Sequence, residues 1–116
     1  MYYYLGQPYT SNFKLVERLR YKAALACLYY FRDIATIYSP IVHYHQMAVD
    51  YKFSGSPEFY ATHNKNMLEF SNGLIVFKLK GWKESKGLEF EIKFAKEHNI
   101  NLFSLTSSLE LGVFHG

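Results

Sequence analysis

Apolar residues form four short continuous runs, and each run is bounded by Gly, Pro or polar residues. The runs are YYYL at 2–5, TIYS at 36–39, GLIVF at 73–77 and NLFSL at 101–105, and they predict four strands. The uninterrupted run at 73–77 is typical of a parallel strand covered on both faces, which predicts that it lies at the centre of a sheet. The first strand ends at Gly6. The second is stopped by Pro40, and the segment SPIVHYH that follows is expected to be a loop.

Helical spacing predicts helices between these strands. One is expected from Ser11 or Asn12 to about Ala35, with its apolar stripe at Leu15, Leu19, Ala23, Cys27, Tyr30 and Ile34. Residues 46–62, which contain Gly55 and Pro57, indicate only loop and short helix. Further helices are expected at 58–70 and 84–98. Strand and helix therefore alternate, which predicts a single α/β domain over residues 1–116, a three-layer Rossmann or flavodoxin-like fold with a mainly parallel sheet of four to five strands.

Composition narrows the class of protein. Hydrophobic residues make up 49% and charged residues 20% of the 116 residues, which is typical of a soluble globular domain. No apolar run approaches the roughly 20 residues of a membrane helix, and MYYYLGQPY lacks the features of a secretory signal. We therefore expect a cytoplasmic protein without a membrane partner. The single cysteine, Cys27, is interpreted as a buried structural thiol.

Charge and aromatic content indicate the kind of ligand. The net charge of +3 is spread along the chain, which favours a small anionic ligand over duplex nucleic acid. Aromatic residues reach 19%, so we expect rings to line a pocket or a subunit interface. Because ligands of parallel α/β sheets bind beyond the carboxyl ends of the strands, the candidate loops are Gly6–Tyr9, Ser39–His45 and Lys80–Ser85.

The segment GWKESKGLEFEI contains two glutamates with different predicted environments. On a helical wheel, Leu88, Phe90, Ile92, Phe94 and Ala95 form an apolar arc that includes Glu91. Glu89 falls on the polar face, where it can pair with Lys93. A carboxylate on an apolar face is costly unless it is paired, so Glu91 is either a functional group or a structural glutamate that reaches Lys80 or a tyrosine hydroxyl.

Ser85 marks the predicted start of this last helix. A serine there most often is an N-cap. The same helix N-terminus, with the amides of Lys86 and Gly87, also suits an anion, because glycine lets a phosphate approach the backbone. Cap and phosphate seat are compatible roles, and the pattern favours the cap.

Three segments carry a resemblance to a known family. YLGQPYT, YSPIVHYH and GWKESKGLEFEI together resemble a family of short phage- or prophage-type proteins that is itself similar to the nucleoside 2-deoxyribosyltransferase superfamily. The resemblance covers about residues 2–105, and its specific part is the pattern Ser-x-Gly-x-x-x-Glu at Ser85, Gly87 and Glu91. It implies that Glu91 attacks the anomeric carbon of a nucleoside or nucleotide. Ser85, where transferases have Asp, implies a 5′-phosphate.

Other positions follow or depart from that pattern. The resemblance implies that a tyrosine after the first strand, Tyr9 or Tyr4, orients Glu91, and we favour Tyr9. Asn64 and Asn72 replace aspartates of the transferases. Asn64 is able to bind a base but not to protonate it, so that role passes to His43, His45 or Tyr9, unless the protein is inactive.

The remaining candidates have two interpretations each. His43 and His45 are either polar groups of the pocket or surface residues, and as a pair they are a poor metal set. Trp82 either forms a wall against the base or covers the core. Gly6 ends the first strand beside the expected site and is included among the substrate-binding residues. We expect no metal and no cofactor.

The predicted function is that of an N-glycosidase or 2-deoxyribosyltransferase acting on a nucleoside 5′-monophosphate. The alternatives are a non-catalytic module that binds or sequesters a nucleotide, and an NAD-type glycohydrolase. The expected partner is a small nucleotide or nucleoside. A homodimer or larger assembly is also expected, located in the cytoplasm, which is the host's if a phage encodes the protein.

Overall fold

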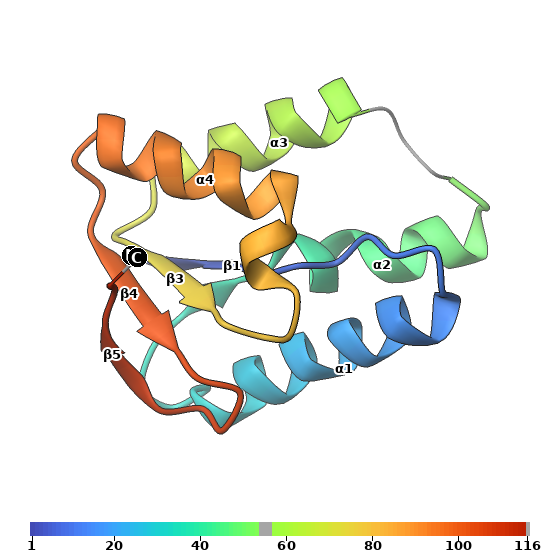
Figure 1. The fold of residues 1–116 in the computed structure, drawn as a ribbon, viewed down its shortest axis with the longest axis horizontal. Coiled ribbons are helices and arrows are strands. Elements are labelled where there is room, and N and C mark those ends of the chain that lie inside the picture. Colours follow the sequence, from blue (N-terminus) through green and yellow to red (C-terminus); the bar gives the residue numbers. More distant parts are fainter. Residues whose placement is uncertain (54–56, 116) are drawn as a thin grey trace.

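The computed structural model of the chain describes residues 1–53 and 57–115, and Gly55 lies outside them. Its strands are β1 (Tyr3–Gly6), β2 (Ile37–Tyr38), β3 (Leu74–Phe77), β4 (Leu102–Leu105) and β5 (Leu111–Val113). They form one five-stranded sheet in the order β2-β1-β3-β4-β5 (Figure 1). The pairs among β1 to β4 are parallel and the β4–β5 pair is antiparallel. The predicted Rossmann-like α/β fold is confirmed, with β3 at its centre.

Helices cover both faces of the sheet. They are α1 (Lys14–Tyr30), α2 (Pro40–Asp50), α3 (Pro57–Glu69) and α4 (Lys86–Glu97), with a short 3-10 helix, η1 (Trp82–Glu84). Figure 1 shows α3 and α4 on one side of the sheet and α1 on the other. Alternation along β1 places Tyr4 in the core under α4 and Leu5 in the core under α1. Each face therefore has its own apolar core.

The predicted apolar stripe of α1 is wrong at four of its six positions, whereas Cys27 is buried as predicted and Ala23 packs against the core. Leu15, Leu19, Tyr30 and Ile34 are all more than half exposed, and the buried residues of the helix are Ala24 and Cys27. A spacing of four residues drifts by roughly 40° per step on a helix of 3.6 residues per turn, so Leu15 is turned far away from Cys27. The helix also begins after Phe13 and ends at Tyr30, which leaves Ile34 beyond it.

Two further elements differ from the sequence prediction. SPIVHYH does not form a loop but the start of α2, because the Ser39 side chain accepts a hydrogen bond from the amide of Val42 (3.2 Å) and Pro40 takes the first helical position. Proline suits that position, since its missing N–H would have no partner in the helix anyway. Strand β5 was not predicted, because its three residues are all exposed and carry no burial pattern.

Candidate active site

Glu91 is buried in α4 and is held by a tyrosine. Its side chain is 8% exposed, and Oε2 accepts a hydrogen bond from the hydroxyl of the fully buried Tyr4 on β1. Burial raises the pKa of Glu91 from its ordinary value of 4.5 to about 7, and the hydrogen bond from Tyr4 offsets only part of that rise. A carboxyl with a pKa near neutrality, held in fixed orientation, is suited to reaction chemistry.

The hydroxyl that orients Glu91 therefore belongs to Tyr4 and not to Tyr9, the residue favoured from the sequence. Tyr4 lies within β1 on the face toward α4, whereas Tyr9 lies three residues after the end of the strand. The Tyr9 hydroxyl is 2.5 Å from Nδ1 of His45 on α2. Side-chain direction in a strand is set by its two-residue alternation, and beyond Gly6 that rule no longer applies.

Gly6 makes room for the Glu91 carboxylate. A Cβ at position 6 would lie 2.9 Å from Cδ1 of Leu88, 3.0 Å from Cδ1 of Leu74 and 3.1 Å from Oε1 of Glu91. Gly6, the last residue of β1, thus lies in close contact with α4. Any side chain here would displace either the core leucines or the carboxylate.

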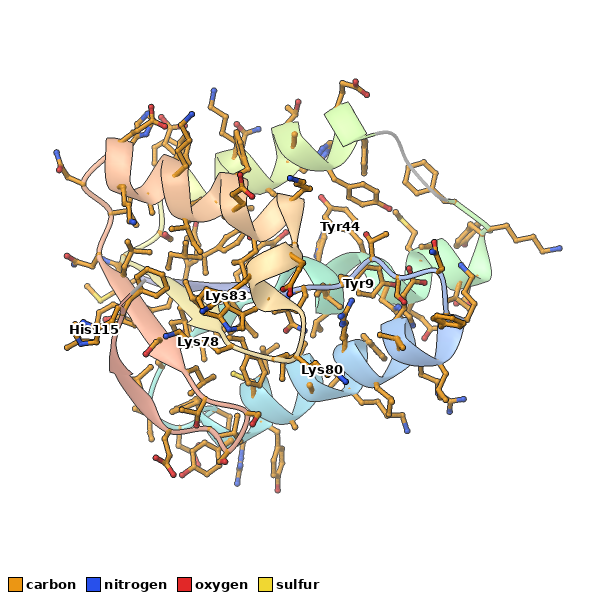
Figure 2. All side chains as sticks on the ribbon, in the orientation of Figure 1. Tyr9, Tyr44, Lys78, Lys80, Lys83 and His115 are labelled. Atoms are coloured by element: carbon orange, nitrogen blue, oxygen red, sulfur yellow. The ribbon has the colours of Figure 1, made fainter. Side chains whose placement is uncertain are left out.

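A pocket of about 1870 Å³ opens beside Glu91, with walls from all four α-helices. It includes Tyr9, His45, Asn64, Ser85, Gly87 and Glu91 among the residues predicted for the site. Figure 2 shows Tyr9 and Tyr44 in the region between α3 and α1. The pocket thus lies at the carboxyl end of β1, where ligands of such sheets bind.

The pocket concentrates the positive charge of the protein. Of the 13 Lys and Arg residues seven line it, against three of the 10 Asp and Glu residues. The cations are Lys14, Arg18, Arg20, Lys22, Lys52, Lys65 and Lys86, and the acids are Glu17, Glu84 and Glu91. Low-dielectric walls strengthen the field of such a cleft. An anionic ligand is therefore favoured.

The N-terminus of α4 faces this pocket. Oγ of Ser85 accepts a hydrogen bond from the amide of Leu88 (3.3 Å), so Ser85 is the predicted N-cap. Both Ser85 and Gly87 line the pocket, and a Cβ at Gly87 would meet no atom within 4 Å. A ligand thus has open access to the backbone at Gly87.

Tyr9 and His45 form a second polar pair in the pocket. The His45 ring stacks on Tyr21, with centroids 4.1 Å apart and an interplanar angle of 17°. Burial raises the pKa of Tyr9 to about 12 and lowers the pKa of His45. At neutral pH both groups are therefore uncharged, and one hydrogen bond joins them. Tyr9 and His45 thus give the pocket an uncharged hydrogen-bonding pair.

Asn64 and Asn72, the two positions that depart from the transferase pattern, lie in different places. Asn64 on α3 lines the pocket, and its Oδ1 is buried without a hydrogen-bond partner among residues 1–53 and 57–115. Asn72 lies at the opposite end of the sheet. Its side-chain Oδ1 accepts a hydrogen bond from the backbone amide of Tyr2 (3.0 Å), and its backbone amide donates to the carbonyl of Tyr2 (2.8 Å). Asn72 is thus structural.

His43 and Trp82, two other predicted site residues, are not in the pocket lining. His43 is exposed, with its ring against Tyr44 (4.5 Å between centroids). Trp82 packs on the core under α4 beside Phe114, with Nζ of Lys78 5.0 Å and Nζ of Lys83 5.5 Å from its ring centroid (the lysines are labelled in Figure 2). Of its two interpretations, covering the core is the one the structure supports.

Two pocket residues were missed in the sequence. The guanidinium of Arg20 donates to the carbonyls of Tyr9 (3.3 Å), Thr10 (3.1 Å) and Lys80 (3.2 Å), so it joins the loop after β1 to the loop after β3. Gln7 is buried next to it. No signal marks Arg20, because an arginine within a helix normally has its charge in water.

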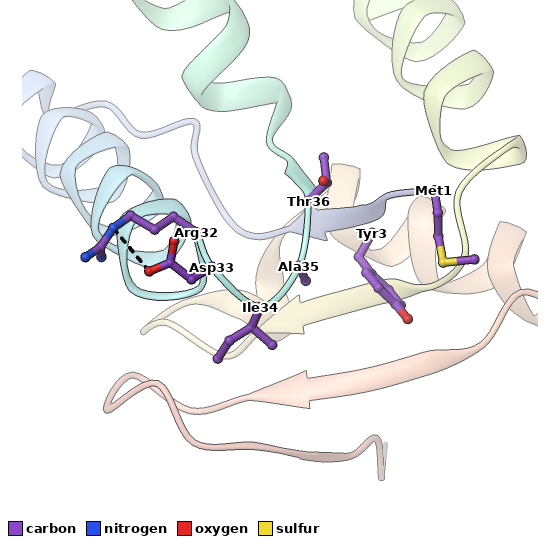
Figure 3. A pocket seen from close by; sticks show the side chains of 7 residues that line it. All are labelled: Met1, Tyr3, Arg32, Asp33, Ile34, Ala35 and Thr36. Carbon is purple, nitrogen blue, oxygen red and sulfur yellow. Dashed lines mark ion pairs between the residues drawn. The ribbon is translucent and has the colours of Figure 1, made fainter.

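A smaller cavity of about 400 Å³ lies at the other end of the sheet. Figure 3 shows its lining, which comes from Met1, Tyr3 and residues 32–36, with an Arg32–Asp33 ion pair at 3.8 Å. It contains none of the predicted site residues.

In the described part of the chain, three or more His, Cys, Asp or Glu residues nowhere gather as a metal site. The helices of the described residues also fall short of the length and apolar character of a membrane span.

The fold and the pocket define a Rossmann-like α/β protein with a buried carboxylate beside a pocket at the carboxyl end of β1. The chain belongs to the family described as Domain of unknown function (DUF1937), whose profile matches residues 2–106. That range contains α1 to α4 and β1 to β4, so it includes Tyr4, Gly6, Ser85 and Glu91. The search of curated proteins found no match.

Proposed function

We propose that the protein is an N-glycosidase or 2-deoxyribosyltransferase acting on a nucleoside 5′-monophosphate, with Glu91 as the nucleophile. The observation that carries the proposal is the Glu91 carboxyl. It is buried, accepts a hydrogen bond from Tyr4 and belongs to the lining of a cationic pocket. The resemblance at Ser85, Gly87 and Glu91 supports the same reaction.

The proposed chemistry is displacement at the anomeric carbon. A Glu91 oxygen forms a bond to C1′ while the glycosidic C–N bond breaks and its electron pair leaves with the base. The base takes a proton from the Tyr9–His45 pair, which regains one from solvent. Water or a second base then resolves the glycosyl-enzyme. With a pKa of about 7, Glu91 is ionised in a large fraction of molecules at neutral pH. The Tyr4 hydroxyl stabilises that ionised form.

The direct test is incubation of the protein with each common ribo- and deoxyribonucleoside monophosphate and with NAD, followed by chromatography of the free bases. Release of a base from a monophosphate is the expected result. Release of nicotinamide alone would assign an NAD-type glycohydrolase instead.

Ser85→Asp provides a test of the phosphate seat. Asp is as good an N-cap as Ser, so the melting temperature should change little. A carboxylate at position 85 would repel a 5′-phosphate at the helix N-terminus, so we expect affinity for monophosphates to fall by a factor of roughly 10 or more while affinity for the free nucleoside is kept. Calorimetric titration with a matched nucleotide and nucleoside measures both. Equal losses for the two ligands would contradict the phosphate assignment.

A non-catalytic nucleotide-binding module is the second candidate. The observation that favours it is Asn64, an amide where the transferases have a carboxylic acid, because an amide binds a base but does not protonate it. In this case a nucleotide would raise the melting temperature and no free base would form.

We also propose that the protein is a homo-oligomer. The support comes from the outer face of α1, where Leu15, Leu19 and Tyr30 are more than half exposed. An isologous contact brings the same patch of two copies together, so an apolar patch is its own complement. We expect light scattering at micromolar concentration to give at least twice the 13.6 kDa of the chain, and Leu15→Lys with Leu19→Lys to return it to a monomer. A monomeric wild type would contradict the proposal.

A further inference from the structure

Gln7 is a buried pocket residue with one unused hydrogen-bond acceptor. Its side chain is 7% exposed and lines the large pocket. Nε2 donates to the backbone carbonyl of Arg20 (3.0 Å), and since a carbonyl only accepts, this bond fixes which end of the amide is which. Oε1 is therefore the other end, and within the described residues it has no hydrogen-bond partner.

An orphaned amide oxygen is costly. Leaving such a group buried without a donor destabilises the folded protein, so each one calls for an explanation. Oδ1 of Asn64, which also lines the pocket, is a second buried acceptor and has no hydrogen-bond partner among the residues that the structure describes. Two unused acceptors in one cationic pocket indicate a ligand that brings hydrogen-bond donors as well as negative charge.

The position of Gln7 indicates which part of the ligand it meets. Gln7 directly follows Gly6, where a Cβ would lie 3.1 Å from Oε1 of Glu91, and consecutive Cα atoms are about 3.8 Å apart. The backbone of Gln7 is thus close to the group that is proposed to attack C1′, while its side chain extends to the backbone of α1 at Arg20. Of the ligand groups next to C1′, the ring oxygen and the glycosidic nitrogen have no hydrogen to donate. The 2′-hydroxyl has one.

We propose that Oε1 of Gln7 accepts a hydrogen bond from the 2′-hydroxyl of the bound sugar and so makes the site selective for ribonucleotides. Of the two reactions proposed above, this selectivity fits the N-glycosidase and not the 2-deoxyribosyltransferase. The inference rests on the proposed function, because it places C1′ at Glu91. Arg20 takes part as a positioning residue, since its backbone carbonyl holds the Gln7 amide and its guanidinium joins the two loops around the pocket.

The test compares each ribonucleoside monophosphate with its 2′-deoxy counterpart by calorimetric titration. Glu91→Gln serves as the background, so that turnover does not disturb binding. We expect the ribonucleotide to bind about 10-fold tighter, and Gln7→Leu to remove this difference by weakening the ribonucleotide alone. Gln7→Met, which keeps the length of the side chain, repeats the test if the leucine variant does not fold.

Gln46→Leu is the matched control. Gln46 also lines the pocket, from α2, but is exposed, and its amide donates to Asp50 (2.8 Å). Its removal should leave the ratio unchanged. Equal affinities for ribo- and deoxyribonucleotides, or a ratio that Gln7→Leu leaves intact, would overturn the role of Gln7 without affecting the proposed function, and an internal water would then be the donor. If no nucleotide binds at all, the proposed function itself fails.

Discussion

Glu91→Gln is expected to abolish base release and at the same time to stabilise the folded protein above pH 7. The amide keeps the size of the side chain and is still able to accept the hydrogen bond from Tyr4. It is no nucleophile, so we expect the rate to fall by at least about 10³-fold. Chromatography of free base from the wild type and the variant at equal concentration measures the loss. Full activity of the variant would remove Glu91 from the reaction.

The gain in stability follows from the raised pKa of Glu91. The folded pKa is about 7 and the ordinary value is 4.5, so the folded state holds the proton more tightly than the unfolded state. The contribution of this bound proton to the free energy of unfolding is therefore fully present below about pH 4.5 and is lost as the pH rises through about 7. At roughly 1.4 kcal/mol per pKa unit, the loss amounts to about 3 kcal/mol.

Urea unfolding at pH 5 and pH 8 measures this difference. Glu91→Gln does not titrate, so its advantage over the wild type should be larger at pH 8 by up to that amount. Tyr4→Phe is the companion variant. It removes the hydrogen bond that lowers the pKa of Glu91. The free energy of unfolding of Tyr4→Phe should therefore continue to fall up to a higher pH than that of the wild type. A gap between wild type and Glu91→Gln that is equal at both pH values would mean that Glu91 has an ordinary pKa.

Gly6→Ala is expected to damage the fold and the site together. The new methyl group would lie 2.9 Å and 3.0 Å from the Cδ1 atoms of Leu88 and Leu74, which are buried and have little space to move. Overpacking of this kind costs about 1–3 kcal/mol. The methyl group also lies 3.1 Å from Oε1 of Glu91. A displacement of the carboxylate by about 1 Å is expected to reduce base release by roughly 10²-fold.

Gly87→Ala is the matched control for the fold. A Cβ there meets nothing within 4 Å, and Ala is favoured over Gly in a helix by up to about 1 kcal/mol. Its free energy of unfolding should equal or exceed that of the wild type, while that of Gly6→Ala falls. Thermal and urea unfolding of the three proteins test the pair. Similar stability of both variants would show that β1 and α4 separate easily at Gly6.

Much of the fold was predictable because it depends on local patterns. The uninterrupted run Leu74–Phe77 indicates a strand covered on both faces, and it is the central strand. Glu91 was expected on the apolar face of its helix, since a period of 3.6 residues fixes which side chains share a face. The N-cap at Ser85 is likewise a contact over three residues.

The stripe of α1 was wrong for a physical reason. Positions four residues apart drift by roughly 40° per step around the helix, so the ends of the predicted stripe do not share a face with Cys27. In the structure the sheet packs against the small side chains around Ala24 and Cys27, and the larger Leu15 and Leu19 remain outside.

The sequence by itself determined the order of β1 to β4 with α1, α3 and α4, the cap of α4 and the unusual position of Glu91, because each depends on neighbours along the chain. Only the tertiary structure decided that Tyr4, 87 residues away, holds Glu91. It also decided that Oε1 of Gln7 has no hydrogen-bond partner within residues 1–53 and 57–115, and that seven cations line one pocket. These features depend on how β1 lies between α1 and α4. Residue spacing carries no information on that packing, because the packing brings together side chains that are far apart in the chain.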